Sequence, residues 1–216
     1  MSLVSDRTPC QDVAVTVRPY RGVSADARRA VRRTALLDAA LDVLGADEPG
    51  PVTMTAICER AGLTERYFYE SFKDRDALLL ELVDTIAVEV MDASLAALER
   101  DGTPEERARR SIAALVDILS EDPRKGRAAL VASLTVPALR ARRQELLAGF
   151  ERLVTDRTRE LYGERAWSAP DDRIESLLFV GGLAELLSAW LSGTVPATPE
   201  EVVDAATRHY LATAHR

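Results

Sequence analysis

The sequence predicts an all-α protein of about nine helices, and three observations support this prediction. The 216 residues are 47% hydrophobic but only 5% aromatic, and alanine and leucine dominate the apolar set. Apolar residues recur at the three- and four-residue spacing of amphipathic helices, and almost no strand-like alternation follows residue 23. Proline and glycine interrupt this pattern between the expected helices. We expect a mobile N-terminal arm at 1–22, a three-helix domain at 23–75 and a larger helical domain at 76–216.

Two short helices joined by a tight turn are expected at about 53–61 and 64–71. Thr53 carries a hydroxyl that can cap the first helix by accepting a hydrogen bond from an unpaired amide. Gly62 can adopt the left-handed conformation that ends this helix. Thr64 then stands at the cap of the second helix. This arrangement is a helix-turn-helix, which lays its second helix in the major groove of DNA.

The other helices are delimited by caps and by helix-breaking residues. The stretches 103–106 and 198–201 both read Thr-Pro-Glu-Glu, a complete helix start with a Thr cap, Pro at the first position and Glu at the third. The expected helices outside the helix-turn-helix are 24–45, 74–100, 104–120, 124–134, 138–161, 172–192 and 199–213.

The net charge of −7 argues at first against nucleic acid, but the charge is unevenly distributed. Residues 18–33 hold six arginines against Asp26 alone. A basic segment beside a helix-turn-helix is typical of a surface that binds phosphate. We therefore expect Arg28 and Arg32 to contact DNA. A solvated helix face is the alternative interpretation of the same charges.

The side chains of the second motif helix sort by helical phase. Leu63, Phe68 and Phe72 are expected to face a small core. Arg66, on the opposite side, could read a guanine edge through paired donors, a contact that discriminates by ~1–3 kcal/mol. The expected DNA-binding residues are Arg28, Arg32, Thr53, Thr64, Glu65, Arg66, Tyr67, Tyr69, Ser71, Lys73 and Arg75.

Tyrosine and basic side chains extend this expected surface. Tyr67 could pack on a thymine methyl group or reach a phosphate, and Tyr69 could bind a phosphate through its hydroxyl. Lys73 and Arg75 stand at the start of the next helix, where they could hold the DNA backbone. The alternative is that the two tyrosines only pack at the rim of the core.

The motif resembles the tetracycline-repressor (TetR/AcrR) family of transcriptional regulators over about a quarter of the chain. The resemblance implies nine or ten helices, a phosphate- or base-contacting role for Tyr69, and a phosphate-binding role for Arg75, where the family usually has lysine. It also implies that Thr53 touches the DNA backbone. The residues that carry it are Thr53-Met54-Thr55-Ala56-Ile57, Ala61-Gly62-Leu63-Thr64, Phe68-Tyr69 with Phe72, and Arg75 with Ala77-Leu78.

The sequence departs from the family pattern at four positions of the second motif helix. Ser71 replaces the usual histidine, so one phosphate contact is expected to be shorter or missing. Glu65 and Glu70 add negative charge, which can accept from cytosine but repels phosphate. Tyr67 is bulkier than the usual threonine. The operator is therefore expected to differ from common ones.

The resemblance also implies a homodimer through the helices at about 172–192 and 199–213, and a small-molecule effector pocket in the C-terminal domain. The helix at 172–192 has two adjacent apolar stripes, which predicts burial on both. A palindromic double-stranded operator fits a two-fold dimer. An apolar or aromatic effector is expected because few polar groups line the candidate pocket, which we assign to Met91, Leu95, Leu115, Leu119, Phe150 and Trp190, with each more often plain core than ligand wall.

Other classes of protein find little support in the sequence. It contains no nucleophile paired with a base, no metal-ligand spacing and no glycine-rich phosphate loop, so we expect no enzyme, no metal and no cofactor. Cys10 and Cys58 are not expected to pair. No segment reaches the ~18 uninterrupted apolar residues of a membrane span, and no secretory signal is evident, so a cytoplasmic location is expected. The expected function is a DNA-binding repressor released by an effector. The alternative is a regulator governed by a protein partner or by abundance.

Overall fold

The computed structural model describes residues 24–46, 50–166 and 170–214, and the expected arm at 1–22 lies outside these ranges. The described residues are helical and contain no β-strand. If the continuous stretch from 123 to 135 is counted once, they form nine helical segments, as predicted. The segments are α1(Ala25–Leu44), α2(Met54–Ala61), α3(Glu65–Tyr69), α4(Arg75–Leu98), α5(Pro104–Glu121), α6(Pro123–Gly126) continuing through η1(Arg127–Ala132) into α7(Ser133–Thr135), α8(Pro137–Tyr162) with the 3₁₀ turn η2(Gly163–Arg165), α9(Asp171–Leu191) and α10(Pro199–Thr213).

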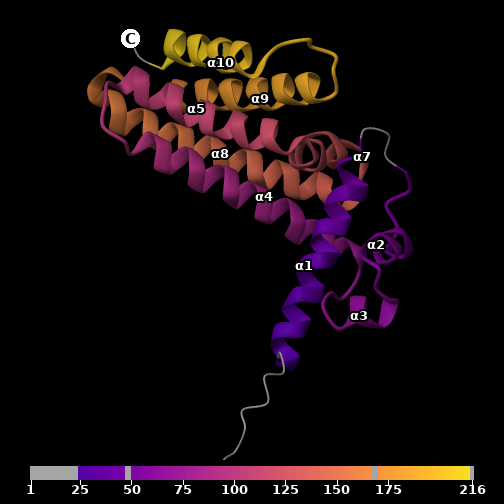
Figure 1. Cartoon of the computed structure of the whole chain (residues 1–216). Helices are drawn as coiled ribbons and strands as arrows, with labels where there is room; N and C mark the ends of the chain where they lie inside the picture. The colour runs from indigo at the N-terminus through magenta and orange to yellow at the C-terminus, as the bar shows by residue number, and fades with distance from the viewer. Residues whose placement is uncertain (1–23, 47–49, 167–169, 215–216) are drawn as a thin grey trace, which may run out of the picture.

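The helices are arranged so that the helix-turn-helix projects from a larger helical bundle (Figure 1). α1 runs out from the bundle, and α2 and α3 lie along its outer part. α4 continues from the motif into the bundle, where it packs against α5 and α8. α9 and α10 lie on the side of the bundle farthest from α3. The motif and the last two helices therefore occupy opposite ends of the chain's structure.

Two hydrophobic cores hold these helices together. The first joins α1 to α4 and includes Leu36, Ile57 and Phe68, each fully buried. The second joins α5, α9 and α10. Leu115 and Phe150 are partly buried and pack against both cores. Burial of apolar surface is the main stabilising term in folding, so these shared residues connect the packing of the helix-turn-helix core to that of the bundle.

The helix starts follow the predicted caps closely. Ser24 Oγ accepts from the amide of Ala27 at 3.0 Å. The two Thr-Pro-Glu-Glu stretches both form reciprocal capping boxes, with Thr103 paired to Glu106 and Thr198 to Glu201. Such bonds satisfy amides that have no partner inside the helix. Local chemistry alone therefore fixes where α1, α5 and α10 begin.

The prediction of one regular helix at 124–134 was wrong in its middle. The segment η1(Arg127–Ala132) is π-helical, between short α-helical turns on either side. A π-helix holds an extra residue per turn, so it shifts the helical phase of the residues that follow. Pro123 starts the segment and Val136-Pro137 separates it from α8. The sequence gives no signal for this distortion, because it depends on how α1, α4 and α9 pack around η1.

By length and composition alone, α9 is the one described helix that could cross a membrane, although charged residues interrupt its apolar run. The core helix of a water-soluble bundle passes the same test. α9 packs against α8, α10, α6 and η1, and Val180, Ala184 and Leu187 are buried there.

Candidate nucleic-acid interface

The turn between α2 and α3 is built from the residues predicted to form it. Thr53 Oγ1 accepts from the amide of Ala56 at 3.1 Å and caps α2. Gly62 ends α2 in the left-handed conformation, at φ 64°. The amide of Leu63 then donates to the carbonyl of Cys58 at 2.9 Å. Thr64 occupies the cap position of α3, but its hydroxyl makes no capping hydrogen bond, so this part of the prediction was wrong.

One face of α3 is buried and the other is exposed. Phe68 is fully buried in the first core, and its ring meets Phe72 at 5.9 Å. On the opposite face, the Arg66 side chain is 85% exposed. Tyr69 is 59% exposed, and Tyr67 is also exposed. Exposure of two aromatic rings and a guanidinium on one five-residue helix makes a surface suited to base edges and phosphates.

Glu70 lies in a network with the arginines of α1 and is not an isolated negative charge. Arg32 donates to its carboxylate at 2.9 Å, and Arg66 approaches the other oxygen at 3.6 Å. Arg29 Nε donates to the Glu70 carbonyl at 2.8 Å. The expectation that Glu70 repels phosphate therefore weakens, whereas Glu65 remains exposed on the same helix.

Two arginines of α1 pack on aromatic rings in and just after α3. The Arg32 guanidinium stacks over the Tyr67 ring, 4.5 Å from its centre, and that of Arg33 over Phe72 at 4.2 Å. Arg33 also donates to the Ser71 carbonyl at 2.6 Å and pairs with Glu81 of α4. Arg32, predicted to bind phosphate, is thus already engaged within the chain.

The start of α4 presents the two remaining basic candidates differently. Asp74 caps α4 by accepting from the amide of Ala77 at 2.8 Å. Lys73 beside it is exposed. Arg75 donates to the Val52 carbonyl at 3.1 Å and pairs with Asp76 at 2.6 Å. Arg75 therefore ties α4 to the segment before α2, while part of its side chain remains at the surface.

Two small apolar cavities lie inside the bundle, at the site predicted for an effector. One, of about 100 Å³, is lined by Leu95, Phe150 and eleven other residues of α4, α5, α8, α9 and α10. The other, of about 80 Å³, is lined by Leu119, Phe150 and eight residues of α4, α5, α8 and η1. Phe150 lines both cavities.

Three of the six candidate pocket residues are absent from the walls of these cavities. Met91 and Leu115 line neither. The Trp190 indole donates to the Ala197 carbonyl at 2.8 Å and packs in the second core. Sequence reasoning missed Arg143 and Arg157, which line one cavity each. Their spacing of seven residues on either side of Phe150 was the signal that could have found them, because it places all three on one helix face.

The outer face of α9 is apolar and exposed. Ile174, Leu177 and Leu178 are each more than half exposed. With Gly181 they follow the i, i+3, i+4, i+7 spacing of one helix stripe. The sequence predicted burial of both apolar stripes of this helix: Val180, Ala184 and Leu187 are buried in the chain's own core, whereas Leu177 is exposed in the single chain.

The predicted apolar residues of α10 also face inward. Val202, Val203, Ala206 and Tyr210 are buried within the chain, so they are not available to a partner in this form. The contribution of α10 to a dimer interface, expected from the sequence, stays a prediction. Ala205 and His209 instead line a surface hollow between α9 and α10, together with Gly182.

Comparison with known proteins assigns the motif. Residues 36–82 match the family model described as bacterial regulatory proteins, tetR family. A curated relative, the HTH-type transcriptional regulator BetI of Rhizobium meliloti, is 35% identical over 77 residues. That match spans 36% of this chain and only 38% of the relative's length.

Solved structures share the fold over most of the chain. The fatty acid degradation regulator FadR from Bacillus halodurans superposes with a TM-score of 0.71 at 17% identity, covering 86% of this chain and 97% of that one. FadR from Bacillus subtilis, in complex with stearoyl-CoA, gives 0.69 at 16% identity over 84% and 99% of the two chains. Residues 36–82 therefore carry a helix-turn-helix similar to that of the tetR family of bacterial regulatory proteins, and the chain shares the fold of these solved regulators over most of its length.

Proposed function

We propose that the chain is a sequence-specific DNA-binding transcriptional regulator, a repressor that a small apolar effector releases from its operator. Residues 23–75 bind DNA, and residues 76–216 bind the effector and a second copy of the chain. The observation that carries this proposal is the face of α3 that exposes Arg66, Tyr67 and Tyr69 to solvent.

The chemistry of this face supports direct readout of DNA. The Arg66 guanidinium can donate two hydrogen bonds to a guanine edge. The hydroxyl of Tyr69 and the ammonium of Lys73 can bind phosphates on either side of the groove. Arg28 lies at the exposed start of α1 and extends the basic surface. We infer that Arg32 acts on DNA indirectly, by holding Tyr67 and Glu70 in place.

The relatives support the regulatory and ligand-binding parts of the proposal. BetI is named as a transcriptional regulator, and the helix-turn-helix lies within the part of this chain that the family model matches. FadR from Bacillus subtilis was solved with stearoyl-CoA, which carries a long apolar chain. The two apolar cavities beside Phe150 favour an apolar effector for this chain too.

We infer that the repressor is a homodimer formed mainly through α9. Exposed apolar stripes of this kind mark protein–protein contact surfaces. The stripe of Ile174, Leu177 and Leu178 ends at Gly181 and Gly182, where an added Cβ would meet no other atom within 4 Å. A partner helix can therefore approach α9 closely there. A two-fold dimer would present two copies of α3 to a palindromic operator.

Selection of bound duplexes from a random DNA pool, at near-physiological salt, tests the proposal. We expect recovery of a palindrome with half-sites about one helical turn, or a multiple of it, apart. Recovery of a single half-site would contradict the dimer. Recovery of no motif by the protein, with or without added effectors, would contradict sequence-specific binding.

A thermal-shift screen distinguishes the effector-released repressor from the alternative, a regulator governed by a protein partner or by abundance. An effector that binds only the native state raises the melting temperature by mass action. We expect compounds that raise it also to lower operator affinity. Compounds that stabilise the protein without changing operator affinity would favour the alternative.

A further inference from the structure

The inner face of α8 carries an arginine, a phenylalanine and a second arginine at equal intervals. Arg143, Phe150 and Arg157 are seven residues apart, so they lie on one face, and their α-carbons are about 10 Å apart in succession. Leu146 and Leu147 lie between the first two on the same face. The two apolar cavities thus follow one another along α8, with a guanidinium at each end and Phe150 between them.

Arg143 has no partner among the described residues. It is half-buried, and its Nε is fully buried without a hydrogen-bond partner. No carboxylate lines the cavity beside it. The neighbouring Arg142 differs, because it pairs with Asp84 at 2.6 Å and with Glu145 at 2.7 Å. A guanidinium that borders an apolar cavity without a counter-charge favours the arrival of an anion.

Arg157 is less suited to hold the anion. Its Nη1 donates to Glu160 at 2.6 Å, so its charge already has a partner. Its Nε and the hydroxyl of Ser94 are buried in the other cavity without partners. These two groups suit a neutral hydrogen bond at the far end of a ligand. The chain therefore distinguishes the two ends of the site by charge.

We propose that the effector is an elongated apolar carboxylate. Its anionic group binds Arg143, and its apolar chain passes Phe150 into the cavity lined by Arg157. This inference rests on the proposed function, because it names the chemical class of the effector. The fork of Arg143 matches a carboxylate with two parallel hydrogen bonds. The cavity beside Arg157 is the larger of the two, at about 100 Å³ against 80 Å³ beside Arg143, and it receives the tail.

Calorimetric titration with decanoate and 1-decanol tests the charge preference. The two probes share a chain length and differ in the head group. We expect decanoate to bind the full-length protein at least about tenfold more tightly, because a charge-assisted hydrogen bond outweighs a neutral one. Equal affinities for the two probes would overturn the assignment of Arg143 as an anion site.

Variants of three arginines on the same helix locate the anion. Arg143→Gln should weaken decanoate about tenfold or more and leave decanol unchanged, and Arg143→Lys should lie between because it keeps the charge without the fork. The matched control is Arg140→Gln, which removes an exposed arginine one turn earlier on α8 and should change neither probe. A loss of decanoate binding in Arg157→Gln but not in Arg143→Gln would overturn the proposal.

The same protein on its selected operator separates this inference from the proposed function. Release of the operator by decanoate, lost in Arg143→Gln, supports both. Operator binding without any decanoate binding would overturn the effector class and leave the regulator intact. Arg143-dependent decanoate binding in a protein that selects no DNA motif would support the site and contradict the regulator.

Discussion

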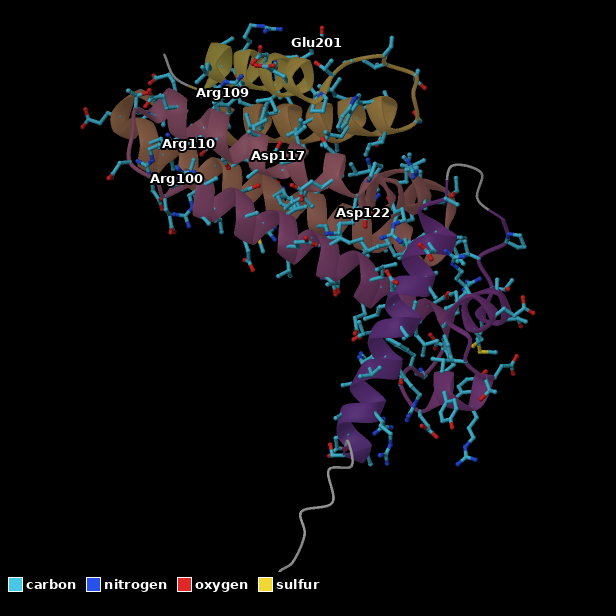
Figure 2. The ribbon with its side chains drawn as sticks, viewed as in Figure 1. Arg100, Arg109, Arg110, Asp117, Asp122 and Glu201 are labelled. Atoms are coloured by element: carbon cyan, nitrogen blue, oxygen red, sulfur yellow. The ribbon has the colours of Figure 1, made fainter. Side chains whose placement is uncertain are left out.

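Arg60 of α2 donates to Asp42 of α1 at 2.6 Å, and the second oxygen of that carboxylate accepts from Arg124 of α6. The Asp42 carboxylate thus connects α1 to α2 of the helix-turn-helix and to α6 of the bundle. Arg124 also pairs with Asp122 at 2.7 Å. Figure 2 shows Asp122 near the end of α1 that meets the bundle. A movement of α6 against α1 must break or stretch these bonds.

Asp42→Asn should loosen the junction. The Asp42 side chain is only 20% exposed, and its loss as an anion leaves two arginines with weaker partners. We expect a loss of about 1–3 kcal/mol in the free energy of unfolding, measured in urea. The control is Asp38→Asn, because Asp38 is 68% exposed and lies 3.9 Å from Arg124. It should change stability by less than about 0.5 kcal/mol. Equal losses in both variants would contradict the special role of Asp42.

Acid should weaken the same junction. Burial raises the pKa of Asp42, but hydrogen bonds from Arg60 and Arg124 outweigh it and hold the pKa below its ordinary value of 3.8. Because the folded pKa is the lower one, Asp42 stabilises the fold above pH 3.8, and this contribution is lost as the pH falls through the folded pKa. The pKa of Asp122 is lowered too, mainly by its hydrogen bond with Arg124.

Urea unfolding between about pH 6 and about pH 3 measures this contribution. We expect the free energy of unfolding to fall toward acid with a smaller slope in Asp42→Asn than in the unchanged protein. Identical slopes would show that Asp42 titrates alike in the folded and unfolded chain, against the ion pairs described.

The local parts of the fold were predictable because their causes are local. Thr53 and Gly62 bound α2 through their own backbone and side-chain preferences, which any helix of this sequence would use. The burial of Phe68 and Phe72 also follows from helical phase alone. The helix-turn-helix was therefore identified from a short stretch, even without a known partner.

Features that depend on contacts between distant segments were not predictable. Arg33 and Glu81 are 48 residues apart, and no pattern in the sequence near either residue predicts that they pair. The charges of Glu70 and Arg32 seemed free in the sequence, yet each neutralises the other. The π-helical turn η1 and the outward face of α9 likewise result from packing. The exposure of Arg66, Tyr67 and Tyr69 was predictable from helical phase, but the arginines that contact this helix were not, and the contacts with DNA stay a prediction.

Gly45→Ala should push α6 away from α1. A Cβ at Gly45 would lie 2.5 Å from the carbonyl oxygen of Arg124 and 2.7 Å from its α-carbon, and backbone atoms cannot rotate aside. We expect a loss of about 1–3 kcal/mol, measured by urea unfolding. Gly149→Ala in α8 is the matched control, because its Cβ meets nothing within 4 Å. It should gain up to about 1 kcal/mol from helix propensity. A tolerated Gly45→Ala would contradict the close contact.

Two substitutions on α3 should have different effects on DNA binding. Arg66→Ala should change which base is preferred at one position of each half-site and cost about 1–3 kcal/mol on the preferred sequence. Tyr69→Phe removes only a hydroxyl and should weaken binding to all sequences alike. Selection on both variants, with operator affinity measured at one salt concentration, distinguishes these outcomes. An unchanged base preference in Arg66→Ala would mean that another residue reads the groove.

Leu178→Glu should separate the dimer without unfolding the protomer. Leu178 is 61% exposed, so the charge stays in water in a monomer but would be buried against the partner's α9. We expect sedimentation to show a dimer for the unchanged protein and a monomer for the variant, with similar melting temperatures at low protein concentration. Val88→Glu is the control, because Val88 is half exposed on α4, away from this face. A Leu178→Glu chain that remained dimeric would place the interface elsewhere, and the weak operator binding expected of a monomer would not follow.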